Sequence, residues 1–397
     1  MSGPRVLWLA RALPLPLDAG DRMYTGFLAQ ALAESGAHVC FVGLPSPDAP
    51  DANPQDYLSS LEFRIVPGKP ASQYRALASS LPLVAGRFGT GEYKRVLISL
   101  LEEQWDAIVL DQYALIWALP ILRTRAGKRP PVIHVAHDFE TQVTRDLAAA
   151  YRGNRLRKAV LALNARRTAR AERALAEACE AVVTLTAEDA DAFRSIGAGG
   201  DLAVIPPGYN GTRVGARGID RDTPRRVAIV GSYQWIVKQH NLRAFLDVAD
   251  ALLDRAGIEL AIVGGAPDDF RRKLEASCKA SRFLGYVDDL PAFLQACRMG
   301  LVIEAVGGGF KLKVLDYVMT RTPVAGLESA LAGQASEVVR HCLKAPNSAA
   351  LCDEIIAAID DFDRLNAMQE AAFEAASRQY DWAENGKRLL SLIRSLS

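Results

Sequence analysis

A glycine-rich segment at positions 307–316 brings three glycines, two lysines and an aspartate together directly after an apolar run that predicts a strand. Glycines let backbone amides approach a ligand closely, and a helix that starts here would point its positive end at the same place. The segment therefore predicts a diphosphate site, in which the lysines supply counter-charge and the aspartate accepts hydrogen bonds from a ribose diol. The expected contacts are Gly308, Gly309, Phe310, Lys311, Lys313 and Asp316. The alternative is a flexible glycine turn with solvated lysines and an aspartate at a helix start.

A second candidate for phosphate binding follows the first apolar run of the second half of the chain. Gly231 and Ser232 come directly after this run, and Lys238 would lie in the loop that enters the next helix, where a cation can meet phosphate oxygens. The alternative is a surface lysine near an N-cap asparagine, Asn241. The position opposite the glycine loop favours the phosphate contact.

The elements that would position these segments follow from short apolar runs that alternate with longer helical patterns, as in βαβ units with parallel sheets. In the first half, strands are expected at 6–10, 38–42, 107–110, 132–135, 181–185 and 203–205. In the second half, they are expected at 227–230, 260–263, 283–284, 300–303 and 323–325. Gly36 should end the helix expected over 24–34, and the pattern is helical from Asn347 onward.

These patterns predict the α/β class, with two Rossmann-like domains whose parallel sheets face a central cleft and whose ligands bind at the carboxyl ends of the strands. The aperiodic segment 209–223 should begin the second domain. We therefore expect an N-terminal domain at 1–208, a C-terminal domain at 209–375 and a terminal helix at 376–397.

Composition narrows the classes of protein. With 397 residues, 50% of them hydrophobic, the chain should form two or three globular domains. Its 47 Lys and Arg nearly balance its 46 Asp and Glu, which argues against nucleic-acid binding by the chain as a whole. The six cysteines are scattered singly, which favours a reducing compartment. Because neither a signal-peptide core nor a membrane-spanning run is found, we expect a cytoplasmic protein.

Missing motifs disfavour two chemistries. Neither half has GxGxxG after its first strand, which argues against a dinucleotide-dependent oxidoreductase, and a Walker A sequence is absent. Asp288 and Asp289 precede Leu290 and Pro291, a pattern typical of a helix N-cap with proline in the first turn. We therefore do not interpret these aspartates as metal ligands, and we expect neither a metal nor a cofactor.

The order of motifs along nearly the whole chain resembles that of the family 4 glycosyltransferases, also called group 1, which have the GT-B fold. In the first half the likeness rests on a glycine loop with Gly20, a Gly-Ala-His-Val step at 36–39, a His-Asp-Phe-Glu element at 137–140 and the sequence Val-Ile-Pro-Pro-Gly at 204–208. In the second half, Gly231-Ser232 with Lys238 is similar to the donor-phosphate motif, and 315–317 followed by Pro-Val at 323–324 is similar to the motif after the glycine loop.

Two positions depart from the family pattern. The family's phosphate-binding arginine falls on Ser232, and Lys311 and Lys313 are expected to replace its charge. The first glutamate of the E-x7-E motif falls on Gly308, and the second is Asp316. In the retaining enzymes that first glutamate lies against the donor sugar, so the sugar and the stereochemical outcome stay open.

The resemblance implies metal-independent transfer of a sugar from a nucleoside-diphosphate donor, with a UDP-sugar favoured, to a glycan or lipid-linked acceptor in surface polysaccharide or glycoconjugate assembly. It places Tyr286 at the nucleotide base and Gly20 near the donor, and it implies that the terminal helix crosses back to the first domain. The rivals are an oxidoreductase or a nucleotide-sugar epimerase, and a degenerate protein that binds a nucleotide sugar without catalysis.

Across the expected cleft, His137, Asp138 and Glu140 form a dense titratable cluster at a strand end of the first half. They are expected to contact the donor sugar or the acceptor, with a general base among them if the enzyme inverts. The alternative is that Asp138 caps the next helix and that His137 lies in a polar rim.

One helical stretch is strongly basic, with cations at Arg152, Arg155, Arg157, Lys158, Arg166, Arg167, Arg170 and Arg173. Beside apolar Leu156, Val160 and Leu163, this stretch could dock on anionic lipids at the inner face of the plasma membrane. The alternative is a solvated helix face.

Overall fold

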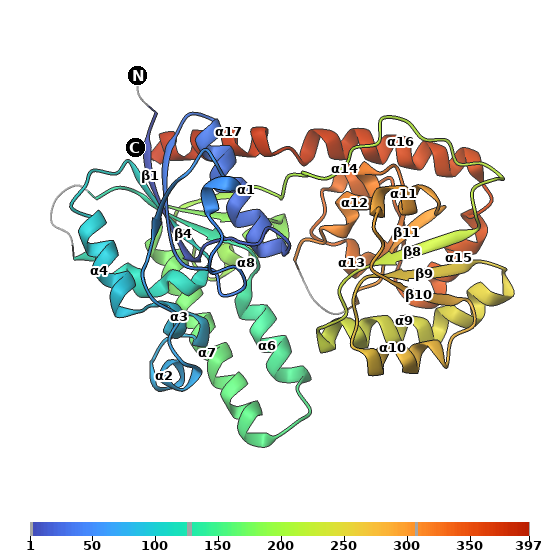
Figure 1. Cartoon of the computed structure of the whole chain (residues 1–397), viewed down its shortest axis with the longest axis horizontal. Helices are drawn as coiled ribbons and strands as arrows, with labels where there is room; N and C mark the ends of the chain where they lie inside the picture. Colours follow the sequence, from blue (N-terminus) through green and yellow to red (C-terminus); the bar gives the residue numbers. More distant parts are fainter. Residues whose placement is uncertain (1–2, 125–128, 306–308, 397) are drawn as a thin grey trace. The chain divides into compact units, whose positions relative to one another are not determined.

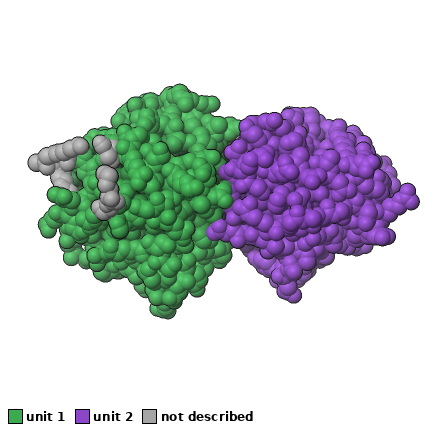
Figure 2. All heavy atoms as spheres, turned by 90° about the horizontal axis from the view of Figure 1, so that it is seen from above, with its two compact units in different colours: residues 1–208, 381–397 green, residues 209–380 purple. Residues whose placement is uncertain are grey.

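The computed structural model describes residues 3–124, 129–305 and 309–396, which fold into two compact units (Figure 1, Figure 2). Unit 1 comprises Met1–Gly208 and Asp381–Ser397, and unit 2 comprises Tyr209–Tyr380. Unit 2 begins where the aperiodic segment 209–223 begins. It ends after Tyr380 and not at 375, because helix α16 (Phe362–Gln379) continues to that point and packs on other helices of unit 2.

Unit 1 is built on a seven-stranded parallel sheet with the strand order β3-β2-β1-β4-β5-β6-β7. Its strands are β1 (Arg5–Ala12), β2 (His38–Leu44), β3 (Glu62–Ile65), β4 (Ala107–Asp111), β5 (Val132–Ala136), β6 (Ala181–Thr184) and β7 (Asp201–Val204). β4 and β5 are buried at every residue, as central strands of a sheet covered on both faces must be. The side chains of successive β1 residues point to opposite faces of the sheet. Leu7 and Leu9 belong to one core cluster, whereas Trp8, on the other face, stacks on Phe41.

The helices of unit 1 lie in the connections between these strands, except α17 (Trp382–Leu396), which ends the chain. They are α1 (Gly20–Glu34), α2 (Gln73–Ala78), α3 (Leu83–Phe88), α4 (Gly91–Leu100), α5 (Leu119–Arg123), α6 (Glu140–Ala150), α7 (Arg155–Ala178), α8 (Ala187–Ser195) and α17 (Trp382–Leu396), with 3-10 turns at Pro54–Asp56 and Tyr113–Ala118. Gly36, with φ +106°, follows the end of α1 as predicted. α6 and α7 form a hairpin that extends beyond the sheet (Figure 1).

The terminal helix α17 belongs to unit 1 because it packs along α1. Gly386 of α17 lies so near α1 that a Cβ at this position would come within 2.1 Å of the Ala31 carbonyl oxygen. The Trp382 ring lies 5.9 Å from the Tyr24 ring between centroids. A small residue at the crossing therefore lets the two helix backbones meet.

Unit 2 is built on a six-stranded parallel sheet with the strand order β10-β9-β8-β11-β12-β13. Its strands are β8 (Arg226–Val230), β9 (Glu259–Val263), β10 (Ser281–Gly285), β11 (Met299–Val302), β12 (Val324–Leu327) and β13 (Leu343–Ala345). Its helices besides α16 are α9 (Ile236–Arg255), α10 (Asp268–Glu275), α11 (Leu290–Gln295), α12 (Lys313–Met319), α13 (Glu328–Leu331), α14 (Ser336–Val339) and α15 (Ser348–Ala358). Asp289 caps α11 by accepting the Ala292 amide at 2.9 Å, as its sequence pattern indicates.

The predicted fold class is confirmed, because both units are Rossmann-like and have parallel sheets. Every strand expected from the sequence is present within two residues of its predicted ends. β3 and β13 were missed, since both are short edge strands and neither has an apolar run to mark it. Within the described ranges, no helix is both long and apolar enough to cross a membrane.

Candidate functional site

A buried carboxylate–imidazole pair lies at the carboxyl ends of β4 and β5 in unit 1. Asp111 ends β4 and His137 directly follows β5, so the parallel pairing of these strands brings the two side chains together. His137 Nε2 donates to Asp111 Oδ1 at 2.8 Å, and the Trp8 indole donates to the other carboxylate oxygen at 3.1 Å. Asp111 is 1% exposed and His137 is 9% exposed. Burial alone would lower the pKa of His137, but the Asp111 carboxylate outweighs it, so the pKa is raised.

Gln112 supports this pair from a strained backbone position. Its φ of +70° lies in the left-handed region, which residues with side chains seldom adopt. Its amide donates to the Val135 carbonyl at 2.8 Å, and its side-chain nitrogen donates to His137 Nδ1 at 3.1 Å. Both ring nitrogens are thus hydrogen-bonded, so His137 can take a proton at Nδ1 only if the Gln112 amide turns. Backbone strain of this kind clusters at functional sites.

Asp138 and Glu140 lie where α6 begins. Glu172 of α7 accepts the backbone amides of Glu140 at 2.9 Å and Thr141 at 2.6 Å, so a carboxylate from the neighbouring helix caps α6. Burial raises the pKa of Glu140 to about 7, and the carboxylates of Asp138 and Glu172 add to the rise. Burial also raises the pKa of Glu172 to about 7. Glu140 can therefore gain or lose a proton near neutral pH, as general acid–base chemistry requires.

A small recess in unit 1 joins these groups. It is lined by Gln112, Tyr113, His134, Ala136, His137, Asp138, Glu140 and Glu172. His134 forms part of its wall: the Nδ1 atom donates to the Leu110 carbonyl at 3.1 Å, and burial lowers the pKa of the ring to about 4, which keeps it neutral. The structure thus brings the three predicted titratable residues to one place.

Gly20 is the first residue of α1, the helix that contacts the same pair from another side. Tyr24 packs edge-on against the His137 ring with 5.1 Å between centroids, and Thr25 Oγ1 lies 3.4 Å from His137 Nε2. Asp21, next to Gly20, also contributes to the raised pKa of His137. The predicted glycine loop therefore lies beside the recess.

A second group of predicted residues gathers at the carboxyl ends of β8 and β11 in unit 2. Gly231 follows β8, and a Cβ there would lie 3.4 Å from Lys313 Nζ. Lys313 forms an ion pair with Glu304, which follows β11, and both side chains are largely buried. Burial lowers the pKa of Lys238, and nearby Lys313 lowers it further while Glu304 opposes the change. Lys238 and Lys313 thus both interact with the Glu304 carboxylate, so these three groups together carry a net positive charge. Ser232, next to Gly231, is exposed.

Lys238 lies in the first turn of a helix and not in the loop before one, which corrects the sequence prediction. α9 begins at Ile236 with Trp235 as its N-cap, so Asn241, the alternative cap, lies inside the helix. Sequence reasoning missed this start because Trp235 offers no side-chain acceptor for the first amides. A lysine in a first turn opposes the helix dipole, and a bound anion would reverse that penalty.

Tyr286 follows β10 and forms an exposed aromatic platform. Tyr286 is 80% exposed, and its ring lies against Gly265, where a Cβ would come within 2.6 Å of the Tyr286 hydroxyl. Next to it, Gly264 has φ +120° and donates to the Gly285 carbonyl at 2.6 Å, and a Cβ on Gly264 would collide with the Gly231 carbonyl at 1.9 Å. Gly231, Gly264 and Gly285, which lie at the ends of β8, β9 and β10, thus let these three backbone segments approach one another closely, next to the exposed Tyr286 ring.

The glycine loop is described only in part, since Gly308 lies outside the described residues. Gly309 has φ +77°, which glycine adopts readily, and its carbonyl accepts from Lys311 Nζ at 3.0 Å. Lys311 also helps Lys313 to lower the pKa of Glu304 against the effect of burial, so it belongs to the same cationic group.

Phe310 and Asp316 are engaged with aromatic side chains of unit 2. Phe310 packs edge-on against Tyr380 with 5.4 Å between ring centroids. Asp316 shares a side-chain hydrogen bond with Tyr209, and burial raises the pKa of Asp316 to about 6. To bind a ribose diol, Asp316 would have to give up its hydrogen bond with Tyr209, or accept from Tyr209 and the ribose at the same time.

Sequence reasoning missed four residues of these sites: Asp111, Gln112, Glu172 and Glu304. Asp111 and Glu304 each come at or just after the end of an apolar strand run, which is the signal that would have found them. Gln112 and Glu172 have no local signal, because their partners lie on other elements. Among the residues that the structure describes, no group of three or more His, Cys, Asp or Glu side chains could hold a metal ion.

Comparisons with known proteins match this architecture. The model of the glycosyl transferase 4-like domain matches residues 20–208, and that of glycosyl transferases group 1 matches residues 224–361. No curated protein sequence matches the chain.

Solved structures align with both units. Sucrose-phosphate synthase from Thermosynechococcus elongatus is 17% identical, with 99% of each chain covered and a TM-score of 0.70. HepE from Anabaena, in complex with UDP and glucose, is 17% identical, with 99% of this chain and 100% of that chain covered and a TM-score of 0.64. The trehalose-6-phosphate synthase OtsA is 14% identical, with 99% of each chain covered and a TM-score of 0.64.

The two family models lie on the two units in chain order, and the aligned structures share the pair of parallel-sheet domains. The chain belongs to the group 1 glycosyltransferases and has the GT-B fold.

Proposed function

We propose that this glycosyltransferase moves a hexosyl group from a nucleoside-diphosphate sugar, with UDP as the favoured nucleotide, to a glycan or lipid-linked acceptor. The observation that carries the proposal is the cationic group at the strand ends of unit 2. There Lys313 lies beside Gly231 and forms an ion pair with Glu304, and Lys238 lies near enough to interact electrostatically with both Lys313 and Glu304. A diphosphate would supply the missing negative charge.

The position of Lys238 supports the same ligand. It lies in the first turn of α9, a helix of 20 residues with no acidic residue in that turn. An anion near these amides would gain from both the lysine charge and the helix dipole. Because these cations can neutralise a departing diphosphate, we propose transfer without a divalent metal.

The nucleotide base would stack on Tyr286. Its exposed ring, which lies against Gly265, is a flat, partly apolar surface next to the phosphate site. The choice of UDP draws on relatives of the same fold: HepE has been solved with UDP-glucose, and trehalose-6-phosphate synthase from E. coli with UDP-2-fluoro glucose.

The recess of unit 1 would serve the reacting sugar or the acceptor. Glu140, with a pKa of about 7, is the group best suited to take a proton from an acceptor hydroxyl. Asp111 and Gln112 hold the His137 ring in one orientation, so we assign His137 to binding beside Asp138. We place the reaction in surface polysaccharide or glycoconjugate assembly in the cytoplasm, following the family resemblance.

Two other functions fit the same residues: epimerisation of a nucleotide sugar, and binding of one without catalysis. The departures at Ser232 and Gly308 from the family pattern are the observations that favour the second. An epimerase would convert the donor without any acceptor, and a binding protein would leave the donor unchanged.

A thermal-shift screen tests the donor. UDP, GDP, ADP, their sugar conjugates and NAD(H) are compared in the presence of EDTA, because a ligand of the folded state raises the melting temperature. We expect a shift with UDP and a UDP-sugar, and a loss of affinity of about 10- to 100-fold in Lys238→Ala. Lys344→Ala, at an exposed lysine of the same unit, is the matched control. A shift with NAD(H) alone, or with no nucleotide, would overturn the proposal.

A further inference from the structure

The α6–α7 hairpin concentrates positive charge in a chain that is almost neutral. Between positions 145 and 170 the sequence has eight Lys and Arg and a single carboxylate, whereas the whole chain has a net charge of +1. Asp146 is that carboxylate, and it accepts a hydrogen bond from Gln142. Arg145, Arg166 and Arg170 form no hydrogen bond or ion pair with other residues that the structure describes. Their charge is therefore available to an external partner.

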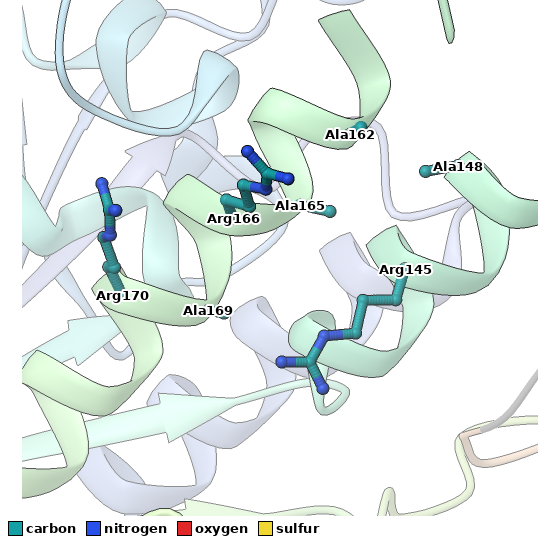
Figure 3. Close-up of a pocket in the computed structure, with 7 residues that line it drawn as sticks. All are labelled: Arg145, Ala148, Ala162, Ala165, Arg166, Ala169 and Arg170. Atoms are coloured by element: carbon teal, nitrogen blue, oxygen red, sulfur yellow. The ribbon is translucent and has the colours of Figure 1, made fainter. Parts of the chain in front are cut away.

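A groove of about 410 Å³ runs between the two helices. It is lined by Arg145, Ala148, Ala162, Ala165, Arg166, Ala169 and Arg170. Figure 3 shows Arg145 reaching from α6 across the space between the helices, while Arg166 and Arg170 extend side by side from α7. The alanines that face this space make its floor apolar and shallow. The groove thus combines guanidinium groups with an apolar surface.

The tip of the hairpin adds exposed apolar side chains. Glu172 lies opposite the start of α6, and α6 ends at Ala150, so the first two turns of α7 extend past the end of α6. Leu156 in these turns is 75% exposed, and Leu163, about two turns further on, is 42% exposed. On α6, Leu147 is 45% exposed. The cations are therefore interleaved with leucines and not with acidic residues.

We infer that the α6–α7 hairpin docks this protein on an anionic lipid bilayer. Lipid headgroups supply the phosphate oxygens that guanidinium groups bind, and the leucines enter the boundary between headgroups and acyl chains. Arginines with long apolar stems suit this boundary, since they keep their charge in the headgroup layer. RNA would also be attracted by the positive charge, but RNA-binding surfaces usually present aromatic rings on which bases stack. At the hairpin tip the ring of Tyr151 is covered by Arg157, and the exposed apolar side chains are leucines.

The hairpin would also bring the recess close to the bilayer. α6 begins at the recess and has 11 residues, so its length is about 17 Å. A docked tip would hold Glu140 within reach of a glycan on a lipid carrier, a consequence that rests on the proposed function. Docking itself does not depend on catalysis.

Vesicle sedimentation with the full chain tests the inference. Vesicles of phosphatidylcholine with about one-third phosphatidylglycerol are compared with pure phosphatidylcholine, at low and high salt. Each basic side chain near an anionic surface strengthens binding about fivefold, so Arg155→Glu, Arg157→Glu and Lys158→Glu together should weaken it by about 100-fold or more. Leu156→Ser with Leu163→Ser should weaken it about tenfold.

The matched control reverses three exposed cations outside the hairpin: Lys94→Glu, Arg243→Glu and Lys344→Glu. It makes the same change in net charge and should leave vesicle binding within about twofold. Equal binding to both vesicle types, or equal losses in the hairpin and control variants, would overturn the inference. Binding of an RNA oligonucleotide through the hairpin without vesicle binding would also overturn it. The UDP-induced thermal shift should persist in the hairpin variant, so failure of docking and failure of donor binding can be told apart.

Discussion

Replacing Glu140 with glutamine should stabilise unit 1 above neutral pH and leave its stability nearly unchanged in acid. Burial raises the pKa of Glu140 from 4.5 to about 7, so between these values the folded state keeps a proton that the unfolded state has lost. The protonated Glu140 therefore makes its full contribution to the free energy of unfolding below about pH 4.5, and this contribution is lost as the pH rises through 7. Glutamine carries no such proton, and so the loss should disappear in Glu140→Gln.

The size of the effect follows from the two pKa values. One pKa unit is worth about 1.4 kcal/mol, so the difference between 4.5 and about 7 corresponds to about 3 kcal/mol at full ionisation. Glu140 is partly exposed, and solvent screening reduces the expected gain to about 2 kcal/mol above pH 8. If this carboxylate takes the acceptor's proton, the same variant should also lower the rate of sugar transfer by about 100-fold or more.

Urea unfolding followed by tryptophan fluorescence measures this gain. Four of the five tryptophans, Trp8, Trp105, Trp117 and Trp382, belong to unit 1, so the signal reports mainly on the unit that holds Glu140. Glu177→Gln, at an exposed glutamate on α7, is the control and should show the pH profile of the unmodified chain. Parallel profiles for Glu140→Gln and the unmodified chain, or a less stable variant at pH 8, would refute the reasoning.

Three further substitutions test other contacts. Asp111→Asn should lower the pKa of His137, measured by NMR titration of the ring, and should cost about 3 kcal/mol in urea unfolding; an unchanged pKa would remove Asp111 as its cause. Gly386→Ala should push α17 off α1 and lower the stability of unit 1 by about 1–3 kcal/mol, and an unchanged midpoint would contradict the close helix crossing. Tyr317→Phe should cost about 1–3 kcal/mol in unit 2, because the buried hydroxyl accepts a β8 amide at 2.8 Å; a neutral result would show that this amide finds another partner.

The positions of the central strands could be predicted well from the sequence, because buried parallel strands are continuous apolar runs. β4 and β5 stand out in this way, and so does the helix that ends at Gly36. The start of α9 was placed too late, since Trp235 at its N-cap gives no capping signal and Asn241 gives a false one. Such errors are local, and they do not change the order of the strands.

The candidate sites were predicted in part, for a different physical reason. His137 and Lys238 are next to strand ends and could be found from position alone. Their partners Asp111 and Glu304 come from neighbouring strands, so the contacts exist only after the sheets form. Glu172, which caps α6 from the C-terminal third of α7, has the sequence context of an ordinary helix residue.

The most direct test of the account is UDP release from a UDP-sugar with and without an acceptor fraction, in EDTA, by the unmodified chain and by Lys238→Ala. We predict acceptor-dependent UDP release that falls by at least about tenfold in Lys238→Ala and persists in Lys344→Ala. Equal release by all three proteins, or conversion of the donor sugar without any release of UDP, would contradict the claim that this cationic group binds the diphosphate of a glycosyl donor.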